Sequence, residues 1–263
     1  MRLYFKLIVI LCIPLLFITI YSLWNGEITC GDFVLRKASI ADYFKTKTET
    51  QDIYDEVLPV PMPEGYSADE EESPLDDSPQ TILMIGDSML ESLKKRLVQY
   101  AGENGHELYT VIWYSSSTKI WAQHSDTLRH FINKFQPTYI FICLGSNEMF
   151  VKNPEKNSVY VDKIIKQTGD IPFIWIGPPN WKEDTGINAI IEQHVGTNRF
   201  FASKRLSYDR ISDGAHPTTE SAAKWMDSVA VWLNTDARHR IVMRKPQQGT
   251  TKASSRTVVL KPL

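Results

Sequence analysis

Three short polar stretches of this chain contain the residue types that nucleophilic catalysis requires. They are Gly86-Asp87-Ser88, Gly145-Ser146-Asn147-Glu148 and Asp213-Gly214-Ala215-His216-Pro217. A serine hydroxyl attacks an acyl carbon when a histidine takes its proton and a carboxylate holds that histidine in place. A side-chain amide can donate a hydrogen bond to the oxyanion that then forms. Taken together and in this order, the stretches predict ester hydrolysis or acyl transfer.

Each stretch alone also has a purely structural explanation. Ser88 could cap the helix that follows it, and Asn147 could close the preceding strand with an Asx turn. His216 could be a helix-cap or surface residue. Its three-residue separation from Asp213 lets the two side chains converge within one loop, in which Gly214 supplies conformational freedom. The catalytic interpretation therefore requires that the three stretches meet in the folded protein.

Short apolar runs alternate with amphipathic segments in the part of the chain that carries these stretches. The strand candidates are Thr81–Ile85, Leu108–Trp113, Tyr139–Leu144 and Ile171–Ile176. Helical spacing of apolar residues occurs around residues 90–100, 128–135, 161–165, 187–191 and 222–233. Strands that are apolar throughout are typical of a parallel sheet covered on both faces. The alternation predicts an α/β domain with a mainly parallel sheet.

The first 24 residues form a separate segment. Leu7–Trp24 is an 18-residue run without a charge, and Arg2 and Lys6 precede it. Such a run can cross a bilayer, whereas the apolar part of a secretory signal is usually shorter, about 7–15 residues. Basic residues before the run are expected to stay in the cytoplasm, which leaves the rest of the chain outside. We expect an uncleaved N-terminal transmembrane helix over residues 1–24, with a cleaved signal or a buried core helix as alternatives.

The rest of the chain divides into three parts. Residues 25–80 are acidic and contain five prolines, a composition that cannot bury enough apolar surface to fold alone. They are predicted to be a solvated linker, with a docking segment as the alternative. Residues 81–234 form the α/β domain. Residues 235–263 are basic and aperiodic, and they are predicted to be a disordered tail.

Composition excludes several other classes of function. The net charge of −2 gives no general attraction to nucleic acid, so we expect no such partner. The three cysteines stand in the predicted membrane run, just after it and within a strand, and we expect no disulfide between them. Because neither H-x-x-x-H nor paired Cys/His spacing occurs, we expect no metal and no other cofactor.

The three stretches, in this order, resemble the motifs of the SGNH (GDSL) hydrolase superfamily. The likeness extends from Thr81 to about Leu233, somewhat over half of the chain. It implies a flavodoxin-like three-layer α/β/α sandwich with a catalytic triad. By this resemblance Ser88 is the nucleophile, His216 the base and Asp213 its orienting acid. Asn147 and the Ser88 backbone N–H are then oxyanion donors.

The chain departs from that family pattern at two positions. Glu148 stands where the family has an aspartate after the asparagine, although Asn147 itself is kept. The glycine whose N–H completes the family's oxyanion hole is missing from the stretch after the second strand, Tyr114-Ser115-Ser116-Ser117-Thr118. We expect the N–H of Ser116 or Ser117 to replace it; an incomplete hole would leave a slow or inactive enzyme.

Aromatic residues gather near the expected strand ends and suggest a substrate. Flat aromatic faces stack on sugar rings, and we expect Trp121, Trp181 and Tyr114 to contribute to a binding rim. Trp113 and Trp175 are expected in the core. The sequence thus predicts a serine esterase that removes O-acyl groups, with O-acetyl expected, from cell-envelope or other carbohydrate, or that acts on a small ester.

Two alternatives to an esterase remain open. An O-acetyltransferase would use the same triad and pass the acyl group to a sugar hydroxyl instead of water. A non-catalytic envelope carbohydrate-binding protein would retain a degenerate triad, which the missing glycine favours. In each case the domain is expected outside the cytoplasm, in the periplasm or at the cell surface, held to the membrane through residues 7–24.

Overall fold

The structure, a computed structural model, describes residues 28–30, 33–35, 74–247, 253 and 255–262. The predicted membrane helix at residues 1–24 lies outside these residues, as does most of the predicted linker. No helix in the described part is long and apolar enough to span a membrane.

The chain separates into two units, Met1–Asp69 and Glu70–Leu263. In the first unit, β1 (Ile28–Cys30) and β2 (Phe33–Leu35) pair as an antiparallel hairpin, inside the segment expected to be linker.

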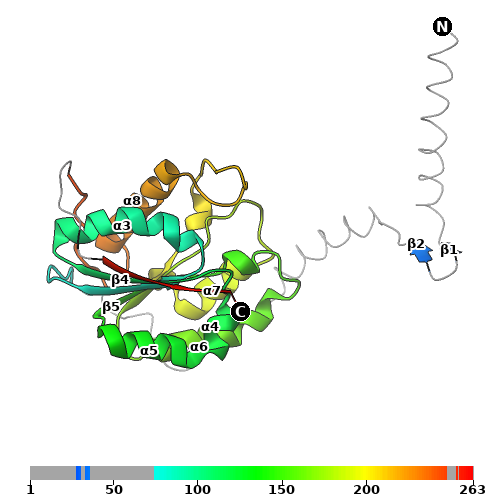
Figure 1. Cartoon of the computed structure of the whole chain (residues 1–263), viewed down its shortest axis with the longest axis horizontal. Coiled ribbons are helices and arrows are strands. Elements are labelled where there is room, and N and C mark those ends of the chain that lie inside the picture. The colour runs from blue at the N-terminus through cyan, green and yellow to red at the C-terminus, as the bar shows by residue number, and fades with distance from the viewer. Residues whose placement is uncertain (1–27, 31–32, 36–73, 248–252, 254, 263) are drawn as a thin grey trace, which may run out of the picture. The chain divides into compact units, whose positions relative to one another are not determined.

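A six-stranded sheet forms the centre of the second unit (Figure 1). Its strands are β3 (Thr81–Gly86), β4 (Glu107–Trp113), β5 (Tyr139–Cys143), β6 (Phe173–Ile176), β7 (Phe200–Phe201) and β8 (Ser255–Leu260). They lie in the order β7-β6-β5-β3-β4-β8, and every neighbouring pair is parallel. Ile85 of β3 lies opposite Val111 of β4 and Ile142 of β5. The predicted α/β domain with a parallel sheet is confirmed.

Helices cover both faces of this sheet (Figure 1). They are α3 (Met89–Asn104), α4 (Thr118–Gln123), α5 (Ser125–Phe135), α6 (Ser158–Thr168), α7 (Ile187–Val195) and α8 (Thr219–Thr235). Ile82 and Met84 of β3 pack on the side of α3 and α8. Leu83 and Ile85 pack on the side of α4 to α7. Successive residues of a strand point to opposite faces, so a fully apolar strand fills both cores.

Short 3₁₀ helices lie in the connections of this domain. They are η1 (Ser146–Glu148), η2 (Pro154–Asn157), η3 (Thr197–Arg199) and η4 (Ser203–Arg205).

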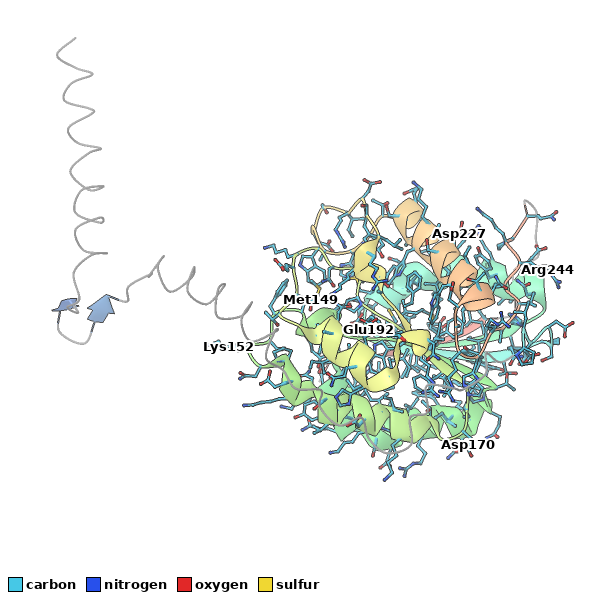
Figure 2. All side chains as sticks on the ribbon, turned by 180° about the vertical axis from the view of Figure 1, so that it is seen from behind. Met149, Lys152, Asp170, Glu192, Asp227 and Arg244 are labelled. Atoms are coloured by element: carbon cyan, nitrogen blue, oxygen red, sulfur yellow. The ribbon has the colours of Figure 1, made fainter. Side chains whose placement is uncertain are left out.

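Helices α3 and α8 lie against each other, and a carboxylate on α8 joins them. Asp227, labelled in Figure 2, accepts a hydrogen bond from Nε of Arg96 at 2.7 Å. It also accepts one from the Tyr100 hydroxyl at 2.9 Å, and Nζ of Lys245 lies 3.3 Å away. This contact fixes α8, and therefore the loop that precedes it, relative to the helix that follows β3.

The prediction of a disordered tail was wrong for the residues described after Asn234. Ser255–Leu260 forms β8, which pairs in parallel with β4. Ile241 and Met243 are buried in the core beneath α3 and α8. Residues 257–260 form a short run that is rich in β-branched residues, which favour strands. Basic and hydroxyl residues surround this run, so the mean composition of the whole tail does not indicate a strand.

The predicted domain boundaries were also too narrow. Asp76 donates its N–H to the carbonyl of Arg240 at 2.9 Å, and Val242 donates to the carbonyl of Asp76 at 2.9 Å. The domain therefore begins before Thr81 and continues past Asn234.

Candidate active site

The candidate site lies where two neighbouring strands send the chain to opposite faces of the sheet. After β3 the chain enters α3 on one face, and after β5 it leads through η1 and η2 to α6 on the other. Such a switch point leaves a crevice at the carboxyl ends of the two strands, which is where open α/β sheets bind ligands. Ser88 follows β3 at this edge and Asn147 follows β5.

Ser88 does not use its side chain to cap α3, although it stands at the N-cap position. The neighbouring Asp87 instead satisfies a free N–H at the start of α3, because its Oδ1 accepts the N–H of Met89 at 2.9 Å. The Ser88 hydroxyl is thereby left for another partner, and the capping explanation of Ser88 fails.

Gly86 is required by space and not by an unusual backbone angle. A Cβ atom at this position would lie 2.3 Å from the carbonyl oxygen of Cys143 on β5, and there is no room for it. The absence of a side chain lets the end of β3 approach β5 closely, which brings Ser88 beside the loop that carries Asn147.

His216 connects Ser88 to Asp213. Its Nε2 lies 2.9 Å from Oγ of Ser88, and its Nδ1 lies 2.6 Å from Oδ2 of Asp213. The other carboxylate oxygen of Asp213 accepts the backbone N–H groups of Ala215 and His216 at 2.8 and 2.9 Å. Gly214 makes this tight loop possible with a φ of 70°. The structure thus brings together the three residues that the sequence singled out.

The protonation of this chain of groups follows from its partners. The backbone N–H of His216, then that of Ala215 and the imidazole, lower the pKa of Asp213 to about 2. Asp213 is therefore ionised near neutral pH and can only accept, which places the proton of a neutral His216 on Nδ1. Nε2 is then an acceptor facing the Ser88 hydroxyl, the arrangement that a general base requires.

Arg210 holds the loop that carries Asp213 and His216. Its guanidinium donates to the carbonyl oxygen of Ala215, and also to those of Pro179 and Asn180 at 2.9 and 2.7 Å. One planar side chain thus joins the loop before α8 to the loop after β6. Nothing in the local sequence indicated this role, because the three acceptors are main-chain oxygens.

Asn147 is exposed at the edge of the site, and its side-chain amide faces two acceptors. Nδ2 donates to the carbonyl oxygen of Ser116 at 2.8 Å and lies 3.5 Å from Oδ2 of Asp87. The second contact is at the long limit for a hydrogen bond, so a small rotation of the side chain can direct this N–H toward a developing oxyanion. Burial raises the pKa of Asp87 to about 7, and the charge of Glu148 adds to this, although the hydrogen bond from Met89 opposes it.

Ser116 and Ser117 are not placed as the missing oxyanion donor in this structure. The Ser116 N–H donates to the carbonyl of Trp113 at 3.1 Å, in a turn that Ser115 permits with a φ of 58°. The Ser116 carbonyl faces Asn147, and C=O and N–H point in opposite directions across a trans peptide. The Ser117 N–H is therefore directed away from Asn147, and these two groups cannot share one oxyanion.

The three predicted aromatic rim residues have different surroundings. Trp121 is fully buried, and its Nε1 donates to the Ser116 hydroxyl at 3.0 Å, so its assignment to the rim was wrong. It stands on the inward face of α4. Tyr114 is half-buried and donates its hydroxyl to Glu91 at 2.7 Å. Trp181 is half-buried as well, and Trp113 and Trp175 lie in the core as expected.

Phe150 is an exposed aromatic residue beside Trp181 that the sequence did not single out. Its side chain is 51% exposed and meets Trp181 edge to face, with ring centroids 5.8 Å apart. The two loops that carry these rings are joined where Thr185 donates its N–H to the carbonyl of Met149, which is labelled in Figure 2, at 2.8 Å. Their position after adjacent strands β5 and β6 was the signal that could have linked them.

The described residues contain no group of three or more His, Cys, Asp or Glu side chains that could hold a metal ion. Cys143 is a free, buried thiol in β5. Neither models of known protein families nor curated proteins match this chain.

Proposed function

We propose that this protein is a serine esterase in which Ser88 attacks the acyl carbon of an ester. The observation that carries the proposal is the continuous chain of hydrogen bonds from Ser88 through His216 to Asp213. A binding protein has no need for an ionised carboxylate that orients a histidine toward a serine hydroxyl. The order of the central strands, β4-β3-β5-β6-β7, agrees with the flavodoxin-like sandwich that the SGNH resemblance implies.

The chemistry proceeds in two steps on Ser88. His216 takes the hydroxyl proton at Nε2 as Oγ bonds to the acyl carbon, and it returns the proton to the leaving alcohol as the acyl–oxygen bond breaks. Water then attacks the acyl-enzyme with His216 again as the base, and the acid and free Ser88 are released. The backbone N–H of Ser88 and Nδ2 of Asn147 are the donors that we assign to the oxyanion.

The proposed substrate is an O-acylated carbohydrate, with acetyl as the acyl group. Exposed Phe150 contacts half-buried Trp181 in the loops after β5 and β6, and Tyr114, just after β4, donates its hydroxyl to Glu91 in the first turn of α3. Sugar rings combine apolar faces with hydroxyl groups and fit such a mixed rim. An N-terminal anchor that places the domain outside the cytoplasm, in reach of envelope polymers, belongs to the same proposal.

The same site supports acyl transfer as a second candidate. The exposed position of Asn147 favours neither water nor a sugar hydroxyl as the group that resolves the acyl-enzyme. Release of acetate in water, compared with release in the presence of an excess of acceptor sugar, separates the two.

The test of the proposal is hydrolysis of 4-nitrophenyl acetate and acetylated polysaccharide by the purified full-length chain. We expect release of acetate by the wild type and loss of nearly all of it in Ser88→Ala. The matched control is Ser228→Ala, a half-buried serine of α8 whose hydroxyl donates to the carbonyl of Lys224. Equal rates in the wild type and Ser88→Ala would remove Ser88 as the nucleophile.

A further inference from the structure

Glu148 is a buried carboxylate beside the site with no part in the mechanism above. Its side chain is only 3% exposed, although the neighbouring Asn147 in η1 is exposed. Burying a carboxylate is costly unless hydrogen bonds replace the lost water. Burial raises the pKa of Glu148, and the donors around the carboxylate oppose this shift. Because burial of this carboxylate costs free energy, we expect a structural or functional reason for it.

The donors to Glu148 come from Thr118, the first residue of α4, and from Asn157, which directly precedes α6. Oε2 accepts the backbone N–H of Thr118 at 2.8 Å, and Oε1 accepts the Thr118 hydroxyl at 2.6 Å. Oε1 also accepts a hydrogen bond from Nδ2 of Asn157, the N-cap residue of α6, at 2.5 Å. Thr118 is fully buried and Asn157 is 8% exposed, so water does not compete for these hydrogen bonds. Each of these three contacts donates a hydrogen to the carboxylate.

These bonds lie next to the contact that orients Asn147. The carbonyl of Ser116, two residues before Thr118, accepts Nδ2 of Asn147. Two successive residues after β5 therefore contact the same short segment after β4, one outward at the site and one inward in the core. If Thr118 moves, the Ser116 carbonyl moves with it, and the side-chain amide of Asn147 loses the hydrogen-bond acceptor that orients it.

We propose that Glu148 is a positioning residue that fixes the loop after β4 against the loop after β5 and thereby orients the Asn147 amide for the oxyanion. This inference rests on the esterase function proposed above. Glu148 touches no reacting atom, and its effect passes through Thr118 and Ser116 to Asn147. The longer glutamate side chain, in place of the aspartate expected from the SGNH resemblance, spans the distance to Thr118.

A double-mutant cycle tests this route. Because the Asn147 amide stabilises charge that exists only in the transition state, Glu148→Ala should lower kcat by about 10–100-fold and change KM little. In the Asn147→Ala background the same substitution should change kcat by less than about threefold. Glu148→Gln, which preserves volume, should give a smaller loss with the same non-additivity if Glu148→Ala fails to fold. Glu155→Gln, an exposed glutamate of η2, is the matched control and should leave kcat unchanged.

Equal factors in the two backgrounds would overturn the inference, because Glu148 would then act independently of Asn147. So would a wild-type kcat in both Glu148 variants. A second readout does not require activity: the side-chain amide resonances of Asn147 in the ¹⁵N-labelled chain. We expect them to shift or broaden in Glu148→Gln and to stay unchanged in Glu155→Gln. An inactive wild type would remove the esterase proposal, yet an unchanged Asn147 resonance in Glu148→Gln would still refute the positioning role on its own.

Discussion

Nε2 of His216 lies 2.9 Å from Oγ of Ser88, although 128 positions of sequence separate the two residues. The contact exists because α3, which begins after Ser88, packs against α8, which begins shortly after His216. The bond between Arg96 and Asp227 fixes the two helices together. The contact between Ser88 and His216 is therefore a consequence of how one layer of the domain packs.

Loss of the carboxylate of Asp213 should disable the base. In Asp213→Asn the amide cannot hold the imidazole with its proton on Nδ1, so Nε2 no longer faces Ser88 as an acceptor. We expect kcat for 4-nitrophenyl acetate to fall by up to about 10⁴-fold, the size of the effect in other serine hydrolases. Asp209→Asn, an exposed aspartate of the preceding loop, is the control and should retain its rate. A rate in Asp213→Asn within threefold of the wild type would mean that another group orients His216.

The orientation of the loop by Arg210 should be sensitive to the shape of its side chain. Arg210→Lys keeps the charge but loses the fork that reaches three carbonyl oxygens. We expect kcat/KM to fall roughly 10–100-fold, since small displacements of a catalytic group are costly. Arg205→Lys, an exposed arginine of η4, serves as the comparison. Identical losses in the two variants would argue against a specific role for Arg210.

Asp87 should make the stability of the domain depend on pH. Its pKa is raised from 3.8 to about 7, so the folded state favours the protonated form. The stability that this group contributes is fully present below pH 3.8 and is lost as the pH rises toward 7. We expect the wild type to lose about 3 kcal/mol in the free energy of unfolding between pH 5 and pH 8 from this group.

Urea unfolding of Asp87→Asn at the two pH values checks this expectation. The amide does not titrate, so the variant should gain about 3 kcal/mol relative to the wild type on going from pH 5 to pH 8. Asp170→Asn, at an exposed residue labelled in Figure 2, should show no such gain. A difference between Asp87→Asn and the wild type that is the same at both pH values would contradict the assignment.

Removal of the last residues should destabilise the domain, because β8 belongs to the sheet. A chain that ends at Gln247 loses the pairing of β8 with β4 and the bond from Nε1 of Trp113 to the carbonyl of Lys261. We expect the Tm to fall by about 5 °C or more. A disordered tail predicts no change, and calorimetry of the two chains distinguishes these outcomes.

The strands and the residues of the candidate site could be predicted because each depends on a local pattern. Apolar runs such as Thr81–Gly86 predict buried strands. The residues that directly follow parallel strands lie at one edge of the sheet. The pairing of Ser88 with His216 then needed only the order of the stretches and the resemblance to a known family.

The features that could not be predicted depend on the direction in which a group points or on contacts between residues that are distant in the sequence. Trp121 follows a strand end, like Trp181, but it lies on the buried face of a short helix that begins at Thr118. The Ser116 N–H was a reasonable donor until the turn at Ser115 directed it to Trp113. Arg210 and Glu148 bind main-chain groups or side chains that are distant in the sequence. The residues next to them therefore do not indicate these contacts.

An activated Ser88 hydroxyl is the basis of the proposed function, and covalent labelling detects such a hydroxyl without a substrate. A fluorophosphonate carries an electrophilic phosphorus, and an activated serine Oγ displaces its fluoride to form a stable phosphonate ester. Intact-mass and peptide analysis of the full-length chain should find one adduct, on Ser88, which is absent in Ser88→Ala and strongly reduced in His216→Ala. An unlabelled wild type, or equal labelling of the wild type and Ser88→Ala, would show that Ser88 is not an activated nucleophile.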